Sequence, residues 1–176
     1  PAAGDDISIR PGDNITVTAD ASIYSITFLN TSATTRTLTI NSGVVLTVTA
    51  GITLQNSLTL NTAAAIAGAG TINCASVIVG GTAPLVTANS TSTLTSTIST
   101  LSISGNLSVI GVDNGTKDND PTFNLQSGIV SVGGSVVLNE VAGTVVTLSL
   151  ASGAQSGTLK ISGATPFTIT GAPTFT

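Results

Sequence analysis

Short runs in which apolar and polar residues alternate recur along the whole chain. Each run has the form apolar–polar–apolar, as in Leu38-Thr39-Ile40, and the polar residue is nearly always Ser or Thr. A period of two is typical of a β-strand with one buried face. The runs begin at Ile7, Ile15, Leu38, Leu46, Ile52, Leu58, Leu101, Leu107, Leu148, Leu159 and Phe167. We expect their apolar residues to point into a core and their polar residues to point outward.

Clusters of Gly, Asn, Ser and Pro separate the runs. PGDN, NSG, SGN and ASG are examples, and such residues favour turns, including turns that need a positive φ. Short strands between short turns suit two architectures. One is an antiparallel β-sandwich, and the other is a solenoid whose strands turn corners and stack on the coil below.

The spacing of the runs favours the solenoid. Grouped into coils, the runs predict units that begin near Ile7, Leu38, Leu58, Leu85, Leu107, Val136 and Leu159. After the first unit, the steps between successive starts match the length of one coil of a β-helical repeat protein, with the longer steps marking loop insertions. We therefore predict an all-β fold, a right-handed parallel β-helix of about six or seven coils in a single domain over residues 1–176. The antiparallel β-sandwich is the alternative.

Two stretches give more local predictions. In TSTLTSTISTLSIS, residues 91–104, Leu94 and Ile98 share one parity and Leu101 and Ile103 share the other. Such a slip of phase marks a corner or bulge between two strands. The stretch AAAIAGAG, residues 63–70, fits a thin coil of small residues, with a short helix as the alternative.

The composition restricts the classes of protein. Ser and Thr make up 52 of 176 residues, charged residues are 7%, and none lies between Thr37 and Val112. Aromatic residues are only 3%, as expected of a narrow core column filled by Val, Ile and Leu. A net charge of -4 with four basic residues excludes the basic surface that nucleic acid requires. No apolar run reaches the roughly 18 residues of a membrane-spanning helix, so we expect no membrane insertion.

The N-terminal third resembles a known class of surface protein. PAAGDDISIRPGDNITVTADASIYSITF, followed by LTINSGVVLTVTAG, is similar to β-solenoid segments of the large secreted adhesin-like proteins that Bacteroidetes-type bacteria export by type 9 secretion. The segment from Pro1 to Leu54 carries the most specific part of this resemblance, and the remainder matches in style. The resemblance implies an extracellular, cell-surface location and structural or adhesive work, and it brings no catalytic residues.

The loop GVDNGTKDNDPTF, residues 111–123, is the main charge cluster outside the N-terminus. Asp113, Asp118, Asn119 and Asp120 offer hard oxygen ligands of the kind that Ca²⁺ takes from flexible loops. Their spacing differs from that of an EF-hand, and Lys117 lies among them. The two hypotheses are a calcium site and a solvated loop that bulges from one coil.

Catalysis is not expected. Asp5, Asp6, Asp13 and Asp20 could supply paired carboxylates for glycoside hydrolysis, yet the chain contains no His and few basic partners. We expect these four residues to stabilise turns and the first coil instead. The single cysteine, Cys74, is expected to be a small buried hydrophobe rather than a reactive thiol.

The expected function is therefore structural. We predict a subunit or segment of an extracellular fibre that associates head to tail, because neither terminus of the chain offers a recognisable cap and the surface carries little charge. The alternatives are a segment of a longer chain, a monomeric adhesin module that binds surface glycans or ice, and a polysaccharide-active enzyme. Binding of ice would need outward Thr residues in register across coils, and the T-x-T pairs shift position between the predicted units.

Overall fold

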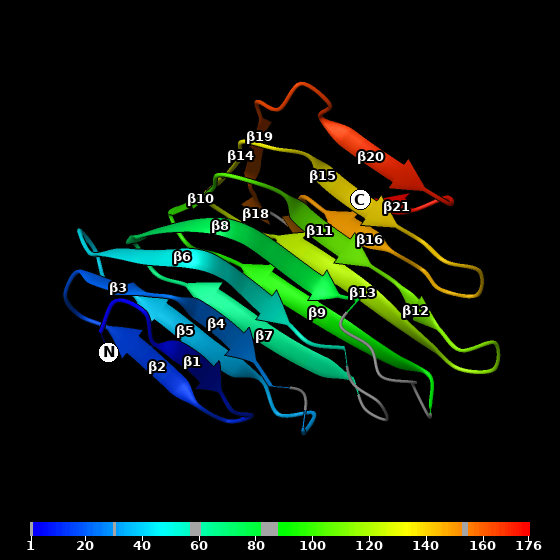
Figure 1. Ribbon diagram of the computed structural model, residues 1–176, viewed down its shortest axis with the longest axis horizontal. Coiled ribbons are helices and arrows are strands. Elements are labelled where there is room, and N and C mark those ends of the chain that lie inside the picture. The colour runs from blue at the N-terminus through cyan, green and yellow to red at the C-terminus, as the bar shows by residue number, and fades with distance from the viewer. Residues whose placement is uncertain (1, 30, 57–60, 82–87, 153–154) are drawn as a thin grey trace.

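The computed structural model describes residues 2–29, 31–56, 61–81, 88–152 and 155–176. In these residues the protein is all-β, and its strands stack in parallel as a β-solenoid (Figure 1). The antiparallel sandwich is thereby excluded, and the predicted fold class is confirmed. The described part of the chain holds no helix with the length and apolar character that crossing a membrane requires.

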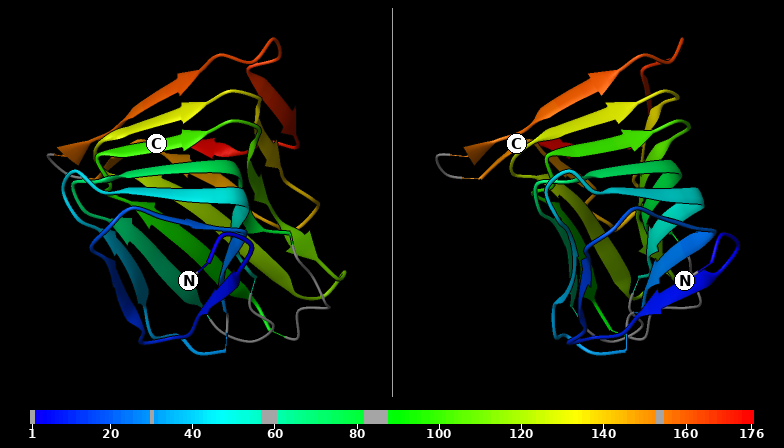
Figure 2. Two further views of the ribbon diagram at one scale, coloured as in Figure 1. Left: turned by 60° about the vertical axis from the view of Figure 1, so that its left-hand side comes forward. Right: turned by 90° about the vertical axis from the view of Figure 1, so that its left-hand side faces the viewer.

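Three walls of parallel strands enclose the core, and the chain visits them in a fixed order (Figure 2). The first wall contains β3 (Ala21–Ile23), residues 45–48 of β6 (Val45–Leu54), residues 71–74 of β8 (Thr71–Gly80), β10 (Thr100–Ile103), β14 (Ile129–Val132) and β19 (Thr158–Ile161). The second wall contains β1 (Asp6–Ile9), β4 (Ser25–Phe28), the remainder of β6 and of β8, β11 (Leu107–Ile110), β15 (Val136–Asn139) and β20 (Phe167–Thr170).

The third wall forms a sheet of its own. It contains β2 (Asn14–Val17), β5 (Arg36–Ile40), β7 (Thr62–Ala67), β9 (Ser90–Ser96), β13 (Asp118–Leu125), β16 (Thr147–Ser149) and β21 (Thr174–Phe175). Two antiparallel pairs are added to the walls. β12 (Val112–Asp113) folds back on the start of β13, and β17 (Ala151–Ser152) pairs with β18 (Gln155–Ser156).

The register between coils keeps like residues together. Leu101 pairs with Ile72 of the coil below it and with Val130 of the coil above it. Coil length varies, since the step along the chain from Leu46 to its neighbour Ile72 is shorter than the step from Ile72 to Leu101. The alternation of period two thus places apolar side chains above one another along the axis, and the column is continuous.

The predicted grouping into coils was wrong in detail. It made Leu38 and Leu107 equivalent as the first residues of their units, whereas Leu38 lies in the third wall and Leu107 in the second. Leu58 and Leu85, two other predicted unit starts, lie outside the described residues. The error arose because all three walls use the same apolar–hydroxyl–apolar pattern.

The local predictions were confirmed. Residues 91–104 form most of β9 and β10 with a corner between them, and Leu94, Ile98 and Leu101 are all buried. The small residues after Asn61 form strand β7 and not a helix. Cys74 is buried in the core column as a free thiol.

Close stacking of coils predicts an effect of glycine substitutions. Gly128 and Gly43 both have positive φ, at 78° and 74°. A Cβ at Gly128 would overlap the carbonyl oxygen of Ile98 in the coil below, whereas a Cβ at Gly43 meets nothing within 4 Å. We expect Gly43→Ala to lower the free energy of unfolding by about 1 kcal/mol and Gly128→Ala by about 3 kcal/mol, as measured by denaturant titration. Equal losses for the two variants would contradict the close packing of the Gly128 corner.

Candidate functional site

At the two ends of the described column, the outermost strands have one edge without a neighbouring strand. In the described residues, β1, β2 and β3 at one end each pair with a strand on one side only. β19, β20 and β21 at the other end do the same. A strand with one free side presents unpaired backbone N–H and C=O groups to any strand that approaches it.

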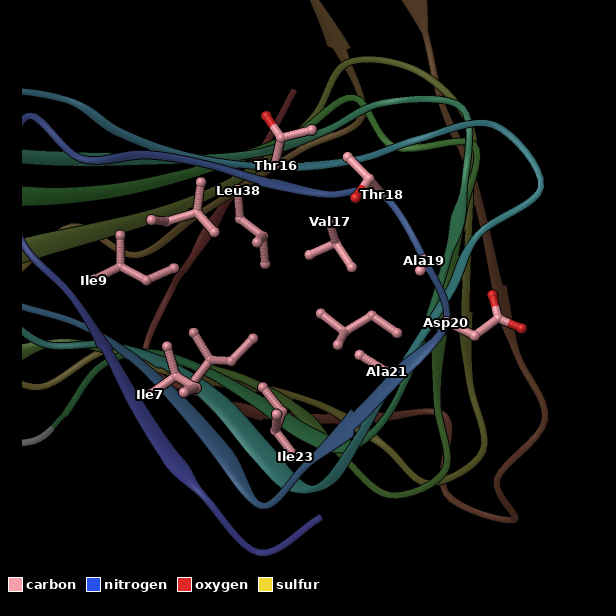
Figure 3. Close-up of a pocket in the computed structure, with 13 residues that line it drawn as sticks. Ile7, Ile9, Thr16, Val17, Thr18, Ala19, Asp20, Ala21, Ile23 and Leu38 are labelled. Carbon is pink, nitrogen blue, oxygen red and sulfur yellow. The ribbon is translucent and has the colours of Figure 1, made fainter. Parts of the chain in front are cut away.

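The N-terminal end is an apolar hollow of about 490 Å³ (Figure 3). Its side chains come from the first coil and from the coil above it, and Ile7, Ile9, Val17, Ile23 and Leu38 all point into it. The hydroxyl and carboxylate groups of the same segment lie at its outer rim. The hollow is therefore the open mouth of the core column, lined with the residues that would otherwise be buried.

The C-terminal end presents apolar side chains rather than a hollow. Phe167, Ile169 and Phe175 are 41%, 49% and 51% exposed. The rings of Phe167 and Phe175 meet edge to face, with centroids 6.1 Å apart and an interplanar angle of 77°, a geometry that aromatic pairs favour.

Register shows that these exposed side chains belong to the core. Phe123 pairs with Leu148, and Leu148 pairs with Phe175, so the three lie in one column of the third wall. Phe123 is fully buried and Leu148 nearly so. Phe175 is exposed only because no further coil lies on it.

The aspartates of the first coils stabilise turns and the first coil, as the sequence predicted. The Ala2 N–H donates to Asp5 at 2.7 Å, and the Arg10 N–H donates to Asp13 at 2.9 Å. Asp20 accepts from the Val45 N–H of the next coil at 2.8 Å, and Asp6 accepts from the Ser25 hydroxyl. All four carboxylates are thus tied to the backbone or to the adjacent strand.

The predicted calcium ligands do not all face the same side. Strand alternation points Asn119 into the interior, where its Nδ2 donates to Ser90 Oγ at 2.9 Å, while Asp118 and Asp120 point outward. Asp113 pairs with Asp118 across β12 and β13 and accepts the Gly115 N–H at 2.8 Å. Among the described residues, no three His, Cys, Asp or Glu side chains lie together as a metal site would need. Calcium binding by this loop stays a prediction, which titration with CaCl₂ would test.

The pKa of the Asp120 carboxyl group is raised. Burial is the main cause that raises its pKa, and the neighbouring charges of Asp118 and Glu140 raise it further. A hydrogen bond from the Val145 N–H, at 2.6 Å, acts in the opposite direction. This bond ties the β13 coil to the next one, which is a structural use of the carboxylate.

A row of buried polar side chains follows the inner corner where the third wall begins. Arg36 is fully buried and donates to the carbonyl oxygens of Ala63 and Ser32, at 2.9 and 3.3 Å, and burial lowers its pKa. Thr62 bonds to Ser92 at 3.3 Å in the coils above. This row was not predicted from the sequence, although Arg36 shares its parity with the inward Leu38.

Outward side chains form columns as regular as the inward ones. Thr93, Thr122, Thr147 and Thr174 are in register on the third wall, so the expected shift of Thr between coils was wrong for this column. The column ends at Ala63 of β7. On the first wall and its corner, Thr47, Asn73, Ser102 and Ser131 line a shallow depression of about 470 Å³.

Comparison with protein-family models, with curated proteins and with solved structures finds no match to this chain. The architecture alone defines its class, a β-solenoid protein with a parallel β-helical repeat.

Cys74 should be unreactive in the folded protein. Burial raises the pKa of its thiol to about 12, so the nucleophilic thiolate is scarce at neutral pH. We expect iodoacetamide to label Cys74 at pH 8 at least tenfold faster in denaturant than in native buffer. Equal labelling rates in the two buffers would contradict the burial of this thiol.

The same burial predicts a pH dependence of stability. Because the unfolded thiol ionises near pH 9 and the folded one near pH 12, the free energy of unfolding should fall as pH rises through this window.

Proposed function

We propose that this protein is an extracellular structural protein whose copies stack end to end into a fibre with a scaffolding or adhesive role. The observation that carries the proposal is the chemistry of the two ends. One end is an apolar hollow, the other presents exposed Phe and Ile side chains, and both have free strand edges. Both ends are apolar and both have free strand edges, so a second copy is the occupant that we assign to each end.

The geometry of such a contact favours a polymer. The two ends differ, so the contact is heterologous, and a heterologous contact that does not close into a ring propagates as a filament. In the described residues, the strands of the three walls run parallel to the wall strands beside them, which makes the added copy a continuation of the same column. Burying the exposed side chains would contribute about 1.5 to 3 kcal/mol for each fully covered Phe or Ile.

The outward faces of the walls carry little charge and many small hydroxyl groups, which suits the surface of a fibre. No charged residue lies between Thr37 and Val112, and the outward positions there are mostly Thr, Ser and Asn. Small hydroxyl side chains hydrogen-bond to the next coil, as Ser104 and Ser127 do with the carbonyl oxygens of Cys74 and Thr97. We propose no catalytic role, since the Asp residues of the first coils form hydrogen bonds within turns or with the adjacent coil and the chain has no His.

Binding of surface glycans is a second candidate function, and the depression on the first wall favours it. Its hydroxyl and amide groups, from Thr47, Asn73, Ser102 and Ser131, are spaced by one coil along the axis. A chain of sugar hydroxyls could bond to several of them in turn. A glycan array would test this function, and loss of any bound signal in Asn73→Ala would place the site.

If the protein forms a fibre, Phe175→Ser should weaken assembly without unfolding the monomer. Phe175 is 51% exposed at the C-terminal end, so its replacement should leave the folded monomer intact while it weakens the end-to-end contact by about 2 kcal/mol, roughly thirtyfold in affinity. Sedimentation velocity and negative-stain microscopy of the purified chain would measure the loss of long assemblies.

Val145→Ser is the matched control for this experiment. Val145 is 49% exposed but lies at the side of the column, beside Asp120 and not at an end. It should assemble like the parent protein. Monomeric behaviour of the parent at high concentration, or equal loss in the two variants, would contradict the proposed fibre.

A further inference from the structure

The order of the walls at the two ends determines how one copy can sit on the next. Along the chain the strands visit the second, third and first walls in turn. β1 lies in the second wall, β2 in the third and β3 in the first. The last three strands, β19, β20 and β21, lie in the first, second and third walls. The described column therefore begins in the second wall and ends in the third.

Two copies stacked with like walls aligned would leave a hole. β1 of the upper copy would pair with β20 of the lower copy, and β2 would pair with β21. In the first wall, β3 of the upper copy would then be two strand spacings above β19, about 9.6 Å instead of about 4.8 Å. One strand would be missing there, and the edge of β19 would stay unpaired.

Resting on the fibre proposed above, we infer that each copy is rotated by one wall, about a third of a turn, relative to its neighbour. After this rotation β1 lies on β19, β2 lies on β20 and β3 lies on β21. The chain order then continues without interruption, because the first wall follows the third. All three edges at each end are paired, and no strand position is empty.

Strand lengths agree with the rotated arrangement. β1 and β19 both have 4 residues, β2 and β20 both have 4, and β3 with 3 residues meets β21 with 2. In the aligned arrangement β2, with 4 residues, would meet the 2 residues of β21. The inward residues also match, since Ile15 and Val17 would cover Phe167 and Ile169 in a register that pairs three residues of β2 with three of β20.

Charge favours the same arrangement. Lys160 is exposed on the outer face of β19, the strand that β1 covers after rotation. Asp6 and Ser8 are the outward residues of β1, so Lys160 would lie opposite Ser8 and diagonal to Asp6, within reach of its long side chain. In the aligned arrangement Lys160 faces the missing strand and gains no such neighbour.

Cysteine pairs can distinguish the two arrangements. Thr168 is an outward residue of β20, and the outward residue above it is Thr16 of β2 after rotation but Ser8 of β1 without it. We expect Thr16→Cys/Thr168→Cys to form disulfide-linked ladders of several copies on mild oxidation, seen on non-reducing gels. We expect Ser8→Cys/Thr168→Cys to give at least tenfold less, and each single variant to give dimers at most. Cys74 is buried and should not contribute.

The outcomes separate this inference from the fibre itself. Ladders from the Ser8 pair alone would overturn the rotation and leave the fibre standing. Absence of ladders from both pairs, with the parent protein sedimenting as a monomer, would overturn both. Absence of ladders from both pairs while the parent forms fibres would overturn the rotation, because both strand contacts would then be excluded.

A charge reversal gives an independent readout. Lys160→Glu should raise the concentration needed for assembly about three- to fivefold, as expected when an exposed ion pair becomes a repulsion, and added salt should reduce the difference. Lys117→Glu, which makes the same change of charge in the loop at the side of the column, should have no such effect. Equal effects of the two variants would contradict a contact between Lys160 and Asp6 of the next copy.

Discussion

Backbone hydrogen bonding along the axis is the constraint on which the structure depends. In a parallel sheet every strand directs its N–H and C=O groups to the strands on both sides, so each coil needs another above and below it. The composition follows from this constraint. Aliphatic side chains such as those of Leu101 and Val130 stack in a narrow interior, and outward hydroxyl groups such as that of Ser162, which donates to the carbonyl oxygen of Val132, bond to the coil below. Few charges are needed for a wall of this kind.

The same constraint fails at both ends of the column, and there we place the function. Phe175 and Phe123 occupy one column of side chains, yet one is half exposed and the other is buried. The difference reflects the presence of neighbouring coils and not the chemistry of the residue. An additional copy would restore to the end residues the environment that interior residues already have, and the order of the three walls determines the rotation at which it can do so.

Much of the fold could be predicted from the sequence, because alternation reports directly which side chains face inward. It placed the strands around Leu38 and Leu101, and it even carried the signal for Arg36, whose parity matches that of Leu38, although a charged residue is not expected inside. The assignment of strands to walls could not be predicted, since the residue types are the same in all three and coil lengths vary. The alternation also carried the signal that Asn119 faces inward while Asp118 and Asp120 face outward, because Asn119 shares its parity with the inward Phe123 and Leu125. This signal was missed because residues 111–123 were expected to form a loop, although residues 118–125 form a strand.

In the fibre that we propose, one β-helical column runs through successive copies without a break. Electron cryo-microscopy of assemblies of the purified chain, with helical reconstruction, tests it most directly. We expect strands stacked at about 4.8 Å through every junction, with each copy turned by one wall relative to the last. Copies joined side by side, or junctions at which the strand stacking is interrupted, would contradict it.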